Sequence, residues 1–155
     1  MAHPSALNTL IDLAHKETDE AAKRLGAALR AGEEAQQKLE LLLAYRDDYA
    51  KRYQSDLSGG ISATHFNNFQ VFMHKLDAAI AGQQKVVGNA ARYAEHARAA
   101  WIVCEQKKMS FITLASRASK ESARCELRRD QKQNDEFAAR QAPRRQNLSR
   151  TGQKP

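Results

Sequence analysis

Proline is absent between Pro4 and Pro143 in this chain of 155 residues. A proline inside a helix costs about 3 kcal/mol, because it removes a backbone hydrogen bond and clashes with the preceding turn. A segment this long without proline therefore permits helices that continue unbroken for many turns. Aromatic residues are also scarce, at 6% of the chain. Such a composition supplies too little bulky apolar material for the deep pocket of a compact enzyme.

Long apolar runs are missing as well. A run such as that from Leu41 to Tyr45 is far shorter than the ~20 residues that cross a bilayer. The first residues, 1–4, contain no basic segment followed by an apolar one, so we expect no signal peptide. We expect the protein to be cytoplasmic.

Cysteine is limited to Cys104 and Cys125. On one helix their separation corresponds to ~31 Å, which excludes a disulfide between them within that helix. Two interpretations remain: small side chains that line a helix contact, or thiols with an intermolecular or redox role.

Motifs of catalysis and cofactor binding are absent. The sequence contains no GxxxxGK[ST], GxGxxG, HExxH or CxxC pattern, and its five histidines are scattered. Adjacent acidic pairs, such as Glu33 with Glu34, have no neighbouring apolar cleft that would raise a pKa. We therefore predict that the chain is not an enzyme and binds no cofactor or metal.

The net charge of +7 is unevenly placed. Residues 1–115 contain 14 Lys and Arg against 13 Asp and Glu, whereas residues 116–155 contain 11 against 5. A basic C-terminal segment suits an acidic protein surface, an anionic membrane or nucleic acid.

Apolar and small residues recur at alternating steps of three and four, which is the heptad spacing of a left-handed coiled coil. The first series comprises Ile11, Ala14, Thr18, Ala21, Leu25, Ala28, Gly32, Ala35, Leu39, Leu42, Arg46, Tyr49 and Tyr53. The second comprises Phe66, Phe69, Met73, Leu76, Ile80, Gln83, Val87, Ala90, Ala94, Ala97, Trp101, Cys104, Lys108, Phe111, Ala115 and Ala118. Each series predicts one face of a long helix.

The consecutive glycines Gly59 and Gly60 separate the two series and predict a turn, because glycine adopts left-handed backbone conformations freely. Ser62 is placed to cap the second helix. We predict an all-α antiparallel coiled-coil hairpin over residues 5–142, in which residue i lies near residue 118 − i. The expected elements are a helix at 5–56, a turn at 57–61, an overhanging helix at 62–141 and a disordered basic tail at 143–155.

Two surfaces are candidates for binding. Phe72 lies beside the second series, where it either covers the edge of the helix contact by packing on Tyr45 or belongs to a docking stripe. That stripe consists of Phe72, Leu76, Ala79 and Gln83. The overhanging helix is the other candidate, because an isolated helix is only marginally stable in water and this one needs a partner. Its basic residues are Arg117, Lys120, Arg124, Arg128, Arg129 and Lys132.

Several stretches over residues 7–140 resemble the FliJ family of flagellar export proteins in their order and spacing about the glycine turn. They are residues 10–14, 19–22, 42–49, 60–62, 68–72, 76–80, Trp101, 131–132 and 135–140. The resemblance implies a two-helix coiled coil similar to the central stalk of rotary ATPases. It implies a role in bacterial flagellum biogenesis through protein export, and hence in motility and chemotaxis.

Three partners are implied by the resemblance: the export ATPase FliI, the export gate protein FlhA and flagellar substrate chaperones. It suggests that the basic residues of the overhanging helix bind the ATPase ring and that the stripe beginning at Phe72 binds the gate. The protein would then lie peripherally at the cytoplasmic face of the cell membrane, associated with it through the export apparatus.

A basic coiled coil that binds nucleic acid is the alternative function. Apart from Phe137, the overhanging helix lacks the interleaved aromatic residues that stack on bases, so we expect no nucleic acid among its partners. The hypothesis that the hairpin binds membranes directly has less support still, because the basic tail has no accompanying apolar face.

Overall fold

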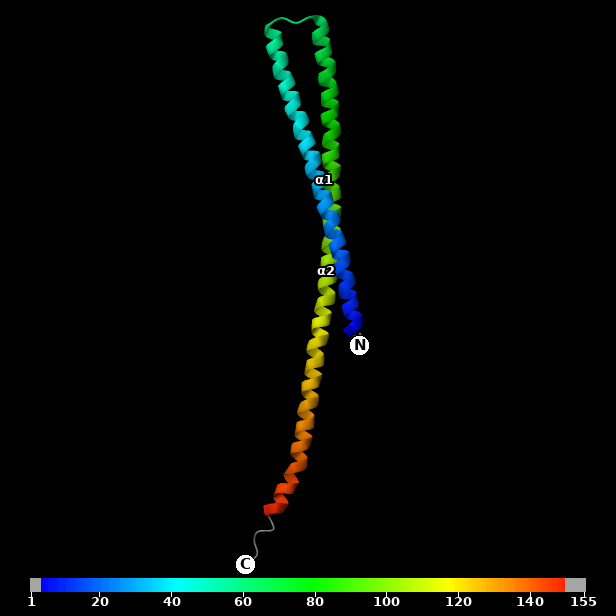
Figure 1. Ribbon diagram of the computed structural model, residues 1–155, viewed down its shortest axis with the longest axis vertical. Coiled ribbons are helices and arrows are strands. Elements are labelled where there is room, and N and C mark those ends of the chain that lie inside the picture. The colour runs from blue at the N-terminus through cyan, green and yellow to red at the C-terminus, as the bar shows by residue number, and fades with distance from the viewer. Residues whose placement is uncertain (1–3, 150–155) are drawn as a thin grey trace, which may run out of the picture. The chain divides into compact units, whose positions relative to one another are not determined.

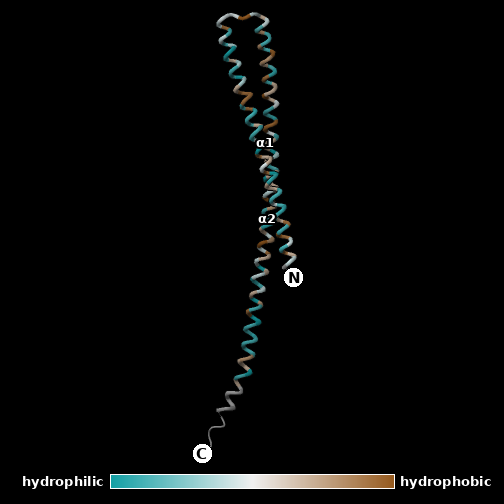
Figure 2. The backbone as a smooth tube through the Cα atoms, in the orientation of Figure 1, coloured by the Kyte–Doolittle hydropathy of each residue, from teal (hydrophilic) through white to brown (hydrophobic). Residues whose placement is uncertain are grey.

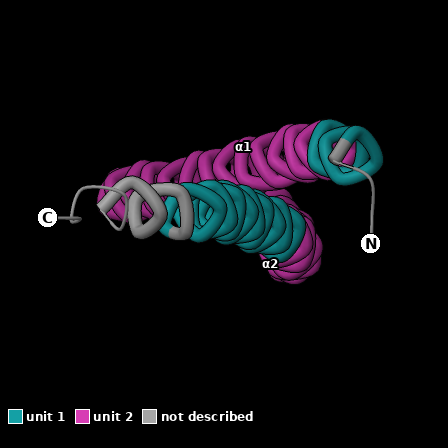
Figure 3. Tube along the Cα trace, turned by 90° about the horizontal axis from the view of Figure 1, so that it is seen from below, with its two compact units in different colours: residues 1–12, 109–155 teal, residues 13–108 magenta. Residues whose placement is uncertain are grey.

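The computed structural model describes residues 4–149 and contains two helices (Figure 1). Helix α1 spans Pro4–Ser58 and helix α2 spans Ala63–Ser149. No strand occurs within the described residues, so the prediction of an all-α antiparallel coiled-coil hairpin is confirmed. The chain divides into two units, which Figure 3 distinguishes by colour and which we describe separately: residues 13–108, and residues 1–12 with 109–155.

The connection between the helices is short and centred on the glycine pair. Gly60 has a φ of 80°, the left-handed conformation that the sequence predicted there. The N–H groups of Gly59 and Gly60 donate to the carbonyl oxygens of Asp56 and Leu57, at 3.1 and 3.2 Å, and close the last turn of α1. At the start of α2, the Ser62 Oγ accepts a hydrogen bond from the backbone N–H of His65 at 3.2 Å. The predicted cap is therefore confirmed.

Gly60→Ala is expected to lower the free energy of unfolding by about 1–2 kcal/mol, because an L-residue is strained in the left-handed region. Urea unfolding followed by circular dichroism measures the change. Gly59→Ala is the matched control: its backbone has no positive φ, and an added Cβ would lie 3.6 Å from the Asp56 carbonyl oxygen, an ordinary contact. Equal losses in the two variants would contradict the explanation.

Residues 13–108 form a paired segment of α1 and α2. Every member of the first predicted series from Ala14 to Tyr53 is buried or half-buried, and so is every member of the second from Phe69 to Lys108. Figure 2 shows apolar residues recurring along both helices. The heptad spacing therefore identified the contact face of each helix correctly, although Phe66 and Ala118 are exposed.

The pairing register follows from contacts between the helices. The ring centroids of Tyr49 and Phe69 lie 5.4 Å apart, and the Gln83 Nε2 donates to the Ala35 carbonyl oxygen at 2.9 Å. In both pairs the residue numbers add up to 118, so the predicted register is confirmed.

Side-chain size changes along this pairing. Alanines provide much of the buried face of α1 over residues 14–35, where Ala14 is 2% and Ala28 is 3% exposed. Closer to the turn, Leu39, Leu76 and Ile80 form an apolar cluster. Beyond it, six of the chain's ten aromatic residues make ring contacts with one another. This aromatic cluster consists of Tyr45, Tyr49, Tyr53, Phe66, Phe69 and Phe72.

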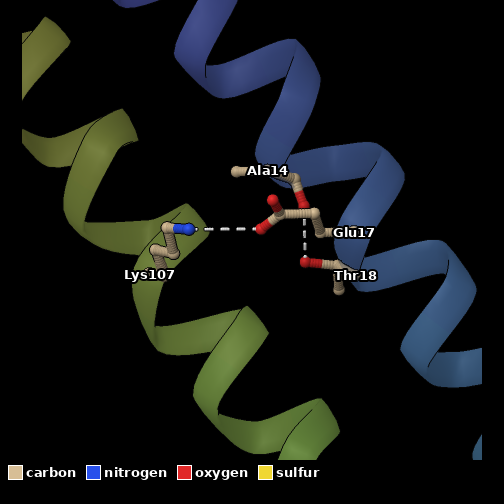
Figure 4. Close-up of polar contacts among 4 residues, drawn as sticks. All are labelled: Ala14, Glu17, Thr18 and Lys107. Atoms are coloured by element: carbon tan, nitrogen blue, oxygen red, sulfur yellow. Dashed lines mark hydrogen bonds and ion pairs between the residues drawn. The ribbon is translucent and has the colours of Figure 1, made fainter.

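Polar contacts border the small-residue section (Figure 4). The Thr18 hydroxyl donates to the carbonyl oxygen of Ala14 at 2.8 Å, which allows a buried hydroxyl in the helix contact. One turn of helix is enough for this bond, since the two residues are four apart. Lys107 of α2 pairs with Glu17 of α1 at 3.3 Å, so the same section also has a charged contact between the helices.

The second unit contains the start of α1 and the end of α2. Leu7 is buried, while Phe111, Ile112 and Ala115 are half-buried. One helix cannot bury a leucine to this extent, so we infer that the residues of α2 in this unit cover it. From residue 116 to residue 142 every side chain is exposed. This exposed segment is the predicted overhang.

Helix α2 ends at Ser149, whereas the sequence predicted an end at 141 before Pro143. Proline there removes the donor to the carbonyl of Ala139 and crowds the preceding turn, and because Ala139 is exposed, water can supply the missing donor. Of the tail predicted to be disordered, residues 143–149 are thus helical, and residues 150–155 lie outside the described part of the chain.

Candidate interaction surfaces

Side chains that could hold a metal ion do not gather in the part of the chain that the structure describes. There, no three His, Cys, Asp or Glu residues lie close enough together to hold a metal ion. Nor does either helix, over its described residues, contain a stretch apolar and long enough to cross a membrane. The candidate sites of this chain are its exposed surfaces.

The two cysteines lie in different environments. Cys104 is half-buried in the contact face of α2, as its place in the second series predicted, and Cys125 is exposed. Both are free thiols.

The predicted docking stripe on α2 is mostly turned toward α1. Leu76 is 7% exposed and belongs to the apolar cluster, and Gln83 is held by its hydrogen bond to the carbonyl of Ala35. Phe72 is half-buried, with ring centroids 6.1 Å from Tyr45 and 4.5 Å from Tyr49. The packing of Phe72 on Tyr45, one of the two interpretations of the sequence, is therefore observed.

Only Ala79 of these four residues is fully exposed. The outer edge of Phe72 and the side chain of Ala79 form the part of the stripe that a partner can touch directly. From the sequence, Tyr45 was predicted only as a packing neighbour of Phe72. It is 54% exposed and extends this surface onto α1. Its predicted contact with Phe72 could have identified Tyr45 as part of this surface.

The basic residues of the overhang are all exposed, and the part of the chain described here gives none of them an ion pair. Arg117, Lys120, Arg124 and Arg128 recur at steps of three and four, so they lie on one face of α2. Lys132 lies at the margin of that face. Arg129 follows Arg128 by about 100° around the helix and lies on its flank.

The other side of this helix is not uniformly basic. Residues 116–142 contain seven Lys and Arg and five Asp and Glu. Two of the acidic residues, Glu126 and Asp130, lie away from the basic face, whereas Glu121 and Asp135 lie on it among the cations. A shallow depression on the overhang is lined by Leu127, Arg128, Gln131, Lys132 and Asp135. It combines apolar and charged groups.

A long exposed continuation of one helix of a two-helix coiled coil is the arrangement that the resemblance implied. A model of the family described as "Flagellar FliJ protein" matches residues 3–147. The chain belongs to the FliJ family. It is 35% identical to the Flagellar FliJ protein of Escherichia coli (strain K12) over 145 residues, which cover 94% of this chain and 99% of that protein. It is 34% identical to the Flagellar FliJ protein of Salmonella typhi, with the same coverage.

Membership of the FliJ family identifies the chain as a component of the flagellar protein export apparatus. The match extends from the first turn of α1 to the last turns of α2, so it includes the paired helices and the exposed overhang alike. Both candidate surfaces therefore lie within the residues that the family model matches.

Proposed function

We propose that the protein is a non-enzymatic coupling component of flagellar type III export, which binds the export ATPase FliI, the gate protein FlhA and substrate chaperones. The observation that carries this proposal is the overhang, in which every side chain from residue 116 to residue 142 is exposed. A lone helix has no tertiary packing to stabilise it, so a helix of this length is suited to being enclosed by a partner. The proposed location is peripheral, at the cytoplasmic face of the membrane.

The basic face of the overhang is the proposed contact with the ATPase ring. Its residues are Arg117, Lys120, Arg124, Arg128, Arg129 and Lys132. Because these cations have no acidic partner within the described chain, their charge is available to acidic or polar groups of a ring pore. The support is the exposure and the alignment of the charges.

Arg124→Glu is expected to weaken binding to purified FliI by about tenfold or more, because it removes a charge-assisted contact and adds a repulsive one. Surface plasmon resonance at two salt concentrations measures the loss, which should shrink as salt is raised. Arg98→Glu, which makes the same charge change at an exposed position outside the overhang, is the control. Equal losses in both variants would indicate only a general charge effect and would contradict the assigned face.

Removal of residues 116–155 is expected to abolish binding to FliI and leave residues 1–115 helical, since the paired segment contains the buried contacts. Circular dichroism and the same binding assay test both parts. An unfolded truncation would show that the division of the chain is wrong. Retained binding would remove the overhang from the ATPase contact.

The surface at Phe72 and Ala79 is the proposed contact with FlhA, with Leu76 and Gln83 supporting it from the helix interface. Ala79→Glu is expected to weaken binding to the cytoplasmic domain of FlhA by about tenfold while leaving the melting temperature unchanged, because Ala79 is exposed. Ala78→Glu is the control, since its side chain is also exposed but lies about 100° further around α2. If Ala79→Glu binds normally, this surface is not the gate contact.

A basic coiled coil that binds nucleic acid remains the alternative. Retention of the purified chain on DNA with a steep dependence on salt would favour it. Binding to FliI that survives nuclease treatment would favour the export function.

A further inference from the structure

An exposed apolar stripe follows α2 through the paired segment. Val86, Tyr93 and Ala100 lie at seven-residue intervals, and Val103 lies one turn beyond Ala100. Val86 is 49%, Tyr93 68% and Val103 61% exposed. In a two-helix coiled coil the positions beside the contact face are usually charged. A third apolar position in each heptad is typical of a helix that packs against more than one neighbour.

Tyr93 is the most prominent residue of the stripe. It lies outside the aromatic cluster, and no ring contact or hydrogen bond connects it to another described residue. Exposed tyrosines in such settings often carry much of the energy of a protein interface, since they bury a large area at a small cost in side-chain entropy.

Charge is segregated around the stripe. Between residues 75 and 107 of α2 the acidic residues are Asp77, Glu95 and Glu105, and all three lie on the other side of the helix. Lys85 and Arg92 lie along the outer flank of the stripe. The Arg92 guanidinium donates a hydrogen bond of 2.6 Å to the Asn89 side-chain oxygen, which carries no charge. No ion pair among the described residues neutralises the positive charge on this flank.

Helix α1 supplies one cation on the inner flank, Arg24, and one anion, Glu17, which lies near Ala100 and is paired with Lys107 at 3.3 Å. The contact between Tyr45 and Phe72 fixes which residues of the two helices face each other on this side. Repeating it at seven-residue intervals places Arg24 opposite Tyr93. Arg24 is paired with Glu20 at 3.6 Å, but both side chains are largely exposed, and such a pair is weak enough to exchange for another acidic group.

We propose that the stripe formed by Val86, Tyr93, Ala100 and Val103 docks an amphipathic helix of another protein, whose apolar face is flanked by acidic residues. The stripe spans about 26 Å of α2, which matches roughly five turns of a partner helix. Apolar side chains of the partner would cover Tyr93 and the valines, and its flanking carboxylates would meet Lys85 and Arg92. This inference does not rest on the proposed export function.

A second copy of the chain is a poorer occupant. Two of its own exposed leucines with acidic neighbours, Leu29 and Leu43, lie on α1. Leu43 is about 200° around the helix from Tyr45, so these leucines border the opposite side of the hairpin from the stripe. Self-association through these leucines would therefore join two different surfaces and continue without closing.

The test uses the full chain and a fluorescein-labelled helical peptide of about 21 residues, with Leu at the first and fourth positions of each heptad and Glu at the two flanking positions. Fluorescence anisotropy should show saturable binding of this peptide. Tyr93→Asp should weaken it by about tenfold or more, and the double variant Lys85→Glu/Arg92→Glu should do the same. The double variant should instead bind the matched peptide that has Lys in place of Glu.

Two control variants test whether the loss of peptide binding is specific to the stripe. Ile102→Asp changes an exposed apolar residue on the other side of α2, and Arg98→Glu reverses a charge there; both should leave peptide binding unchanged. The proposal is overturned if the Glu peptide fails to bind, if the Lys peptide binds the unmodified chain equally well, or if the controls weaken binding as much as Tyr93→Asp. It is also overturned if sedimentation equilibrium shows a self-association that Tyr93→Asp abolishes, because the occupant would then be a second copy.

Discussion

Tyr53→Ala is expected to lower the free energy of unfolding by about 3–5 kcal/mol, the range for removing a buried aromatic side chain. Tyr53 is 9% exposed, and its ring stacks on that of Phe69 with centroids 3.5 Å apart. It also contacts Phe66, so the substitution removes one of the main links between the helices next to the turn. Urea unfolding monitored at the helix band of the circular dichroism spectrum measures the loss.

The hydroxyl of the same residue offers a matched control. Among the described residues, the Tyr53 Oη is buried without a hydrogen-bond partner. A buried polar group without a partner costs about 1–3 kcal/mol, so Tyr53→Phe should be neutral or stabilising while keeping the ring contacts. A Tyr53→Phe variant as unstable as Tyr53→Ala would show that the hydroxyl, and not the aromatic packing, holds this end of the hairpin together.

Leu76→Ala is expected to destabilise the hairpin by about 3 kcal/mol, since it opens a cavity in the cluster with Leu39 and Ile80. The same denaturation assay applies. Leu41→Ala is the control: Leu41 is 70% exposed, so its loss should change stability by less than about 0.5 kcal/mol. A stable Leu76→Ala variant would contradict the assignment of Leu76 to the core.

Loss of binding in a Leu76 variant has a structural explanation. A Leu76→Ala variant that loses a partner has first lost packing between its own helices, so it does not identify a docking residue. Ala79, which is exposed on the same stripe, separates the two effects because its substitution leaves the helix contact intact.

The sequence predicted the fold closely because the relevant signals are local. Alternation of three- and four-residue steps is a property of each helix by itself, and it placed residues from Ala14 to Lys108 on the correct faces. The pair Gly59 and Gly60 marked the turn for a similarly local reason, since only glycine adopts a φ of 80° without strain. Once the turn was fixed, the antiparallel register followed.

The candidate sites were harder to predict. Phe72, Leu76, Ala79 and Gln83 form one stripe in the sequence, but the structure divides it into buried, half-buried and exposed residues. The end of α2 was also missed, because the cost of Pro143 depends on whether water can reach the carbonyl it leaves unpaired. Tyr93 was overlooked among the residues beside the second series, since spacing alone does not tell an edge that is covered from one that is open.

By itself, then, the sequence determined that the chain forms two long helices, where they turn and which residues face each other, because periodicity and backbone preference act along the chain. Only the tertiary structure decided which residues beside the contact face are covered by the opposite helix. Tyr45 and Tyr49 pack on Phe72, and the Ala35 carbonyl accepts a hydrogen bond from Gln83, whereas no ring contact or hydrogen bond joins Tyr93 to another described residue. The physical reason is that exposure is set by side chains of the opposite helix, which are distant in the sequence.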